Sequence, residues 1–196
     1  MSEYISPVPM PALDAVAPEL YRGYYGMPMF IIVPTADLAA SQDFWMRGLG
    51  FIDIFTVPDR LIHLRRWAFQ DVLLVPGEPA AEASAMSTSF ACVLGQIEVI
   101  AERCEQLAPG CASDPQEMPW NSRELTVITP ENVRVVMTAA RPLDPRSPQA
   151  DQFPALFRDC PESPQFITPP ITFDISHRGD CRDMGRIRRP VLSLCP

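Results

Sequence analysis

Hydrophobic residues alternate, or recur at helical spacing, through the middle of the chain and predict two similar series of elements. The first series begins with a strand over 29–33, and a helical stretch over 35–49 starts from a cap at Thr35 or Asp37. Three strand-like runs follow, at 52–57, 60–66 and 71–75. The order is therefore strand, helix and three strands.

The same order returns in the next part of the chain. A strand is predicted over 88–94, and apolar residues then form a one-sided helical stripe over 96–107. Further strands are predicted around 111–112, at 124–128 and at 133–139. We predict an α+β fold in which tandem βαβββ modules form a curved mixed sheet with a cup-like cavity and helices on the outer face. The alternative is a generic α+β domain whose halves are similar by coincidence.

Proline divides the chain into a structured middle and two ends. Residues 1–28 contain five prolines and residues 142–196 contain ten, against eight in the longer stretch between them. We therefore predict an N-terminal arm over 1–27 and a Pro-rich extension over 143–196 that is partly disordered. The domain between them, 28–142, holds modules at about 28–78 and 86–142.

Composition narrows the function classes. The net charge of −8 disfavours nucleic acid as a partner, and the chain has no apolar run long enough to span a membrane. The acidic, proline-broken start is unlike a secretory signal, so we predict a cytoplasmic location. The six cysteines lack the close spacing of zinc or redox motifs, and Cys92 and Cys104 are interpreted as core residues.

Two segments carry a resemblance to a known superfamily. The first runs from Met27 to Leu38 as MPMFIIVPTADL and is followed by Phe44-Trp45 and Leu49-Gly50-Phe51. The second is PWNSREL from Pro119, followed by TPEN from Thr129. Together they resemble the vicinal oxygen chelate superfamily of glyoxalase I, extradiol dioxygenases and bleomycin resistance proteins, and are most similar to the bleomycin-resistance-like branch. The resemblance covers roughly residues 24–142.

The resemblance also indicates where a metal site would lie. Enzymes of the superfamily hold a divalent metal with His, Glu or Gln side chains on the inward faces of strands from both modules. Those positions fall on Phe30, Leu74, Ser89 and Val136, which are not competent ligands apart from a weak oxygen donor at Ser89. The residues on either side also lack His, Asp and Glu, so we predict neither a metal nor another cofactor.

Without a metal, the inward faces would form an apolar cup. Period-two alternation places Ile32, Val72, Ala91, Arg134 and Thr138 on the same faces as the four positions above. Aromatic rings at Phe55, Trp67, Phe69 and Trp120 could stack on a planar ligand at the rim, although each ring taken alone is better explained by packing. The predicted ligand-binding residues are Phe30, Phe55, His63, Trp67, Leu74, Trp120, Arg134 and Val136.

His63 is the candidate for acid–base chemistry, because it is the only histidine in the body of the chain. A satisfied histidine at a strand edge is the structural alternative. Arg65, Arg66, Arg123 and Arg134 could hold an anionic group, and Arg123 could equally pair with Glu124.

Two functions remain open at this point. The first is a metal-free, homodimeric binding protein that sequesters an aromatic antibiotic or related natural product; the resemblance implies both the dimer and a cleft shared by two subunits. The second is a metal-independent isomerase, cyclase or hydrolase of secondary metabolism, with His63 as its acid–base residue. A metal-dependent lyase or dioxygenase would require the alignment of the inward positions to be wrong.

Overall fold

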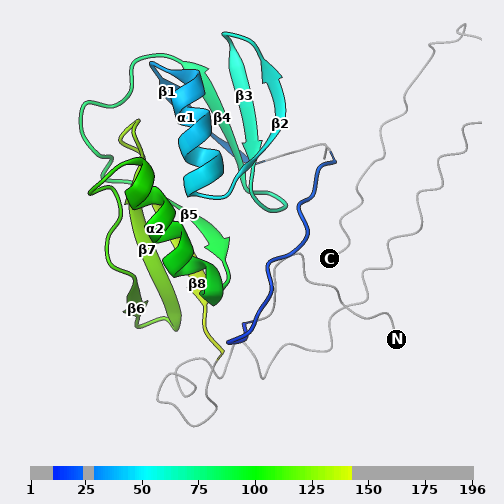
Figure 1. Cartoon of the computed structure of the whole chain (residues 1–196), viewed down its shortest axis with the longest axis vertical. Helices are drawn as coiled ribbons and strands as arrows, with labels where there is room; N and C mark the ends of the chain where they lie inside the picture. The colour runs from blue at the N-terminus through cyan, green and yellow to red at the C-terminus, as the bar shows by residue number, and fades with distance from the viewer. Residues whose placement is uncertain (1–10, 24–28, 143–196) are drawn as a thin grey trace, which may run out of the picture. The chain divides into compact units, whose positions relative to one another are not determined.

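A computed structural model describes residues 11–23 and 29–142, in which two βαβββ modules follow one another (Figure 1). The first consists of β1 (Phe30–Thr35), α1 (Leu38–Asp43), the π-helical turn η1 (Phe44–Gly48), β2 (Ile52–Val57), β3 (Leu61–Arg65) and β4 (Asp71–Pro76). The second consists of β5 (Ser87–Cys92), the short helical turn η2 (Leu94–Gln96), α2 (Ile97–Leu107), β6 (Gln116–Met118), β7 (Ser122–Ile128) and β8 (Arg134–Ala140). The predicted α+β tandem is confirmed.

Each module builds its own four-stranded mixed sheet. The strand orders are β1-β4-β3-β2 and β5-β8-β7-β6, so the two sheets share one topology. In each, the first strand pairs in parallel with the last, and the other neighbours are antiparallel. β1 and β5 therefore lie at sheet edges in the described part of the chain.

Both helices begin and pack as the sequence pattern indicates. Asp37 caps α1, because its Oδ1 accepts hydrogen bonds from the backbone N–H groups of Ala39 and Ala40, both at 3.0 Å. Beyond η1, Gly50 has a φ of +80°, a conformation that glycine adopts without strain and that lets the chain turn into β2. Along α2, Ile97, Ile100 and Cys104 are buried, which confirms the predicted apolar stripe.

The strand predicted around 111–112 is wrong. Ala112 makes only an isolated bridge to Val127, and the edge strand of this sheet is β6, further along the chain. The reason lies in Glu105, whose carboxylate accepts from the backbone N–H groups of Gly110 and Ala112, both at 2.8 Å. An amide that is bonded to this side chain cannot also donate to a neighbouring strand.

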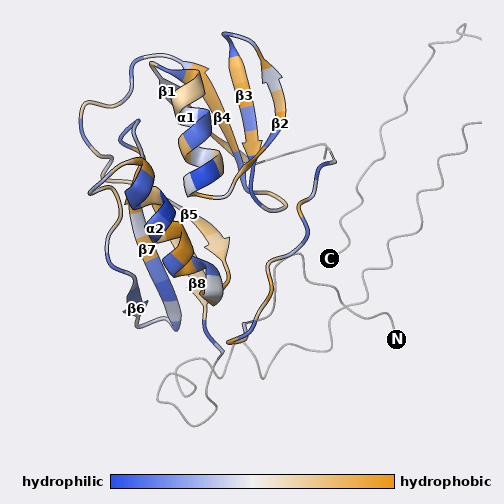
Figure 2. Ribbon diagram, viewed as in Figure 1, coloured by the Kyte–Doolittle hydropathy of each residue, from blue (hydrophilic) through white to orange (hydrophobic). Residues whose placement is uncertain are grey.

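The two modules share one apolar core. Trp45 of the first module stands edge-on to Phe51, at 5.2 Å between ring centroids, and to Phe90 of the second module, at 6.3 Å. Figure 2 shows mostly hydrophobic strands in the first sheet beside helices of mixed hydropathy. Cys92 and Cys104 are buried as predicted, and desolvation raises the pKa of both thiols to about 12.

The predicted extension at 143–196 lies outside the described residues, and so do residues 1–10 and 24–28 of the chain's first part. None of the helices within 11–23 and 29–142 is long and apolar enough to cross a membrane.

Candidate small-molecule site

One face of the first sheet is partly exposed and carries both apolar and polar side chains. Strand pairing places Ile32, Leu73, His63 and Phe55 in one row across β1, β4, β3 and β2. The neighbouring row holds Phe30, Asp71 and Arg65. The other face of the sheet packs into the core through residues such as Val33, Ile62, Leu64, Val72 and Leu74.

The predicted orientation of β4 is therefore wrong. Val72 and Leu74 are fully buried in the core, and Asp71, Leu73 and Val75 share the face of Phe30 and Ile32. Successive side chains point to opposite faces of a sheet. An alignment that is shifted by one residue therefore assigns every side chain of β4 to the wrong face. The predicted faces of β1, β5 and β8 agree with the burial of Val33, Phe90 and Met137.

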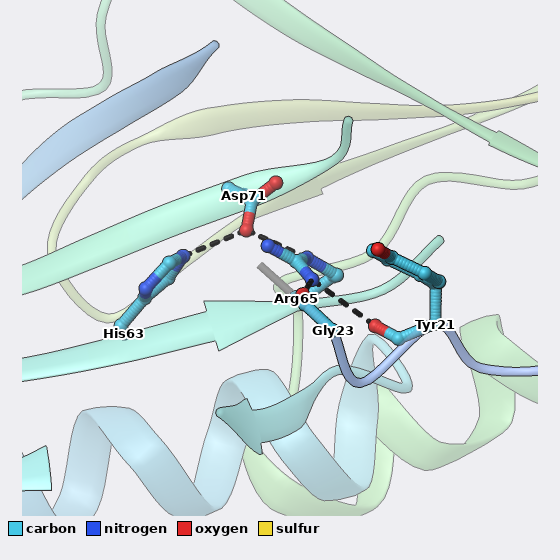
Figure 3. Close-up of polar contacts among 5 residues, drawn as sticks. All are labelled: Tyr21, Gly23, His63, Arg65 and Asp71. Carbon is cyan, nitrogen blue, oxygen red and sulfur yellow. Dashed lines mark hydrogen bonds and ion pairs between the residues drawn. The ribbon is translucent and has the colours of Figure 1, made fainter. Parts of the chain in front are cut away.

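A charged cluster lies at one end of this face, where β3 ends and β4 begins (Figure 3). The Oδ1 atom of Asp71 lies 2.7 Å from Nε2 of His63 and accepts from Nε of Arg65 at 2.8 Å. Asp71 and Arg65 are buried, and His63 keeps 14% of its side chain exposed. Because an ionised carboxylate only accepts hydrogen bonds, Nε2 of His63 carries the proton of this contact, and in the neutral imidazole Nδ1 is then the acceptor.

The N-terminal segment 11–23 reaches this cluster through Arg65. Nη1 of Arg65 donates to the backbone carbonyls of Tyr21, at 3.1 Å, and Gly23, at 2.6 Å (Figure 3). The Tyr21 ring lies over the same guanidinium at 5.6 Å. Arg65 therefore joins the first sheet to a segment that precedes it in the chain.

The second sheet also carries a hollow on its exposed side. A cavity of about 390 Å³ follows β5 and is bounded by Ser89, Glu124 and Thr138 and, from the N-terminal segment, by Pro11 and Ala15. This volume is within the range of small-molecule sites. Val136 and Arg134 lie on the same sheet face and are half-buried, and Nε of Arg134 donates to the carbonyl of Ser84 at 3.0 Å.

The side chains at the inward positions do not fit a divalent metal. Phe30 and Val136 offer no donor, Ser89 offers one hydroxyl, and β4 presents Leu73 instead of the predicted Leu74. Across residues 11–23 and 29–142, no three side chains among His, Cys, Asp and Glu gather in a way that could hold an ion.

The four aromatic residues predicted at the rim differ in exposure, and Phe69 is 57% exposed. Phe55 is 45% exposed beside His63 on the sheet face, and Trp120 is 56% exposed. The indole N–H of Trp120 donates to Glu124 Oε1 at 2.8 Å. Trp67 is only 2% exposed and packs under the guanidinium of Arg66, so its predicted place on the rim of the exposed sheet face is wrong.

No protein-family model matches the chain, and no curated protein matches it. Solved structures do match. The fosfomycin resistance protein FosX from Listeria monocytogenes, in its tetragonal form, is 13% identical with a TM-score of 0.50, over 62% of this chain and 96% of that one. A point mutant of that protein, complexed with Mn(II) and 1S,2S-dihydroxypropylphosphonic acid, is 14% identical with a TM-score of 0.50, over 60% and 92%.

These structures belong to the vicinal oxygen chelate superfamily, which our sequence resemblance named. The described part of the chain has the vicinal oxygen chelate fold. A protein from Nocardioides described as a glyoxalase, bleomycin resistance protein or dioxygenase also matches, at 16% identity and a TM-score of 0.46, over 61% of this chain and 86% of that one. At these identities the similarity shows the fold alone.

Within the vicinal oxygen chelate fold, sequence reasoning missed Asp71 and the place of Arg66. Asp71 stands at the first position of a strand of apolar residues, where an acidic residue is expensive to bury without a partner. That cost, with His63 and Arg65 two residues apart on the preceding strand, was a signal for a paired carboxylate. Arg123 pairs with Glu98 at 2.6 Å, and not with Glu124 as the alternative had it.

Proposed function

We propose that this chain is a small-molecule binding protein that sequesters an aromatic natural product, such as an antibiotic, in the cytoplasm. The observation that supports it is the exposed apolar face of the first sheet. Phe30, Ile32 and Phe55 are 43%, 60% and 45% exposed there, around a histidine held by a buried carboxylate. A face of this kind favours a flat, largely apolar ligand with one polar group.

The proposed mechanism is stoichiometric capture. Full burial of a side chain such as Phe or Ile is worth about 1.5–3 kcal/mol, so a ring that covers Phe30, Ile32 and Phe55 gains binding energy from each. His63 orients the ligand, because its Nδ1 atom accepts a hydrogen bond from a ligand hydroxyl or amide while Nε2 is held by Asp71. Capture alone withholds the bound compound, so this mechanism needs no chemical reaction.

We further propose that the binding unit is a homodimer. β1 and β5 lie at the edges of their sheets, and Met29 beside β1 is 76% exposed. A second copy that covers these edges would bury apolar surface and close the cleft over the ligand. The cavity beside β5 and the face beside β1 would then meet between subunits.

Titration of the protein with a panel of aromatic antibiotics is expected to quench tryptophan fluorescence at micromolar concentrations with a saturable stoichiometry. The Phe55→Ala variant should bind the best ligand about tenfold more weakly, because a stacking ring and its buried area are lost. Met86→Ala is the control, since Met86 is 81% exposed in the loop before β5. Absence of quenching across a broad panel, or equal affinity in both variants, would contradict sequestration on this face.

The second candidate function is a metal-independent enzyme, and the His63–Asp71 contact favours it. A carboxylate that holds one ring nitrogen fixes the tautomer and directs the other nitrogen outward, which is the arrangement of a general base. His63 would take a proton from a ligand C–H or O–H group and return it elsewhere on the same molecule, so that an isomerisation or cyclisation balances without a co-reactant.

If the chain is such an enzyme, His63→Gln is expected to lower kcat about a hundredfold while ligand affinity changes little, because proton transfer is lost and the apolar face remains. The rate of product formation from bound natural products, followed by mass spectrometry, measures kcat. Turnover that survives in His63→Gln would exclude this role.

A further inference from the structure

A second cavity lies away from the exposed sheet faces, where the two modules meet. It has a volume of about 220 Å³ and is bounded by Leu49 and Trp67 of the first module and by Gln96 and Val99 of the second. Pro18 and Leu20 of the N-terminal segment close it from another side. The cavity is smaller than a typical drug site, so it suits a ligand of about one ring.

Arg66 brings a buried positive charge to the wall of this cavity. Its side chain is nearly inaccessible, with the residue 2% exposed. Nε donates to the carbonyl of Leu49 at 3.1 Å, Nη2 donates to Gln96 Oε1 at 3.0 Å, and Nη1 donates to the carbonyl of Ala91. Of the five N–H groups that a guanidinium carries, about two are left over by these bonds.

The charge on Arg66 is not balanced by a carboxylate among the described residues. Its hydrogen-bond acceptors are two backbone carbonyls and one amide, all of them neutral. Burial lowers the pKa of Arg66 to about 10, through desolvation of the charged form, so the guanidinium is still charged at neutral pH. A buried cation without an anion is costly, and an anionic ligand would remove part of that cost.

A second cation and an apolar wall complete the cavity. Arg103, on α2, contributes to the lining together with Ile100, one turn earlier on the same helix. Trp67 lies under the Arg66 guanidinium, with 4.9 Å from the guanidinium carbon to the ring centroid. The cavity therefore offers positive charge at Arg66 and Arg103 and aromatic or aliphatic surface along the rest of its wall.

We infer that this cavity binds a small organic carboxylate, with its anionic group at Arg66 and Arg103 and its apolar part against Trp67, Val99 and Leu20. A carboxylate matches a guanidinium in shape, since both are planar and can form paired hydrogen bonds. Inorganic anions match only the charged half of the site. The site is distinct from the faces proposed above for sequestration, and its occupant would stabilise the junction of the modules and the N-terminal segment together.

Calorimetric titration with benzoate tests this assignment, with benzamide as the uncharged analogue of the same shape and inorganic phosphate as the anion without an apolar part. We expect benzoate to bind about tenfold more tightly than either. The Arg103→Gln variant should lose most of this preference for benzoate over benzamide. Arg141→Gln is the matched control, because Arg141 is partly exposed and pairs with Glu117 away from this cavity.

Arg66→Gln is the stronger variant, used only where circular dichroism shows that it folds, and it should abolish benzoate binding. Equal affinities for benzoate and benzamide, phosphate binding as tight as benzoate, or an unchanged preference in Arg103→Gln would each overturn the proposal. Phe55→Ala should leave benzoate binding unchanged, so a failure here and a failure of antibiotic sequestration are distinguishable.

Discussion

Replacement of Asp71 by alanine is expected to destabilise the protein by about 3–5 kcal/mol, which is the range found when one partner of a buried ion pair is removed. The Asp71 and Arg65 side chains are 0% and 1% exposed, and their contact is 2.8 Å. The variant keeps the Arg65 guanidinium in the interior but takes away the carboxylate that accepts from it and from His63. Urea denaturation followed by circular dichroism measures the loss.

Two further variants separate the parts of this effect. Asp71→Asn keeps an oxygen in place and should cost less, because Arg65 retains an acceptor and loses only the charge. His63→Gln should cost least, about 1 kcal/mol, since the histidine is at the exposed side of the cluster. If Asp71→Ala were no more destabilising than His63→Gln, the buried pair would not be what stabilises this corner of the sheet.

The sequence predicted the tandem modules because their signals are local and repeated. The Asp37 cap, the glycine after η1 and the apolar stripe of α2 each depend on residues within a few positions of one another. Such signals can be recognised in the sequence without knowledge of the tertiary fold. β6, by contrast, is three residues long with two of them exposed, and no pattern of that length identifies a strand.

The candidate site was predicted less well, because the sheet face on which a side chain lies depends on the register of its strand. β4 is apolar on both faces, through Val72 and Leu74 on the core side and Leu73 and Val75 on the other, so its apolar run has no alternation that could fix its orientation. Trp67 and Arg66 follow β3 in the link to β4, where periodicity ends, and Arg66 is bonded there to Leu49 of the first module and to Ala91 and Gln96 of the second. These placements arise from tertiary contacts.

The contacts between modules also explain why one residue of the first module should control the stability of both. Trp45 is fully buried, and its partners come from both halves of the chain: Phe51 follows it closely, whereas Phe90 and Glu131 belong to the second module. Neither module alone encloses this ring. Unfolding of the native chain should therefore be a single cooperative transition.

Trp45→Ala is expected to cost about 3–5 kcal/mol, since it leaves a large cavity beside Phe51 and Phe90, whose rings pack edge to face with their centroids 5.1 Å apart. Trp45→Phe keeps a ring in the core but removes the indole N–H that donates to Glu131 Oε2 at 3.3 Å. The Oε1 atom of Glu131 is buried without a hydrogen-bond partner in the described structure, so this variant leaves both carboxylate oxygens without one and should cost about 1–3 kcal/mol.

A double-mutant cycle of Trp45→Phe with Glu131→Ala isolates the indole–carboxylate contact, and a coupling of about 0.5–3 kcal/mol is expected because the two side chains touch. If the two substitutions lower the free energy of unfolding additively, the cost of Trp45→Phe comes from lost packing and not from the hydrogen bond. The alanine variant carries the larger test: with the ring gone, the modules lose their shared centre, and denaturation should broaden or split. A sharp single transition in Trp45→Ala would mean that other contacts, such as the one between Phe51 and Phe90 or those of Arg66 with Ala91 and Gln96, suffice to couple them.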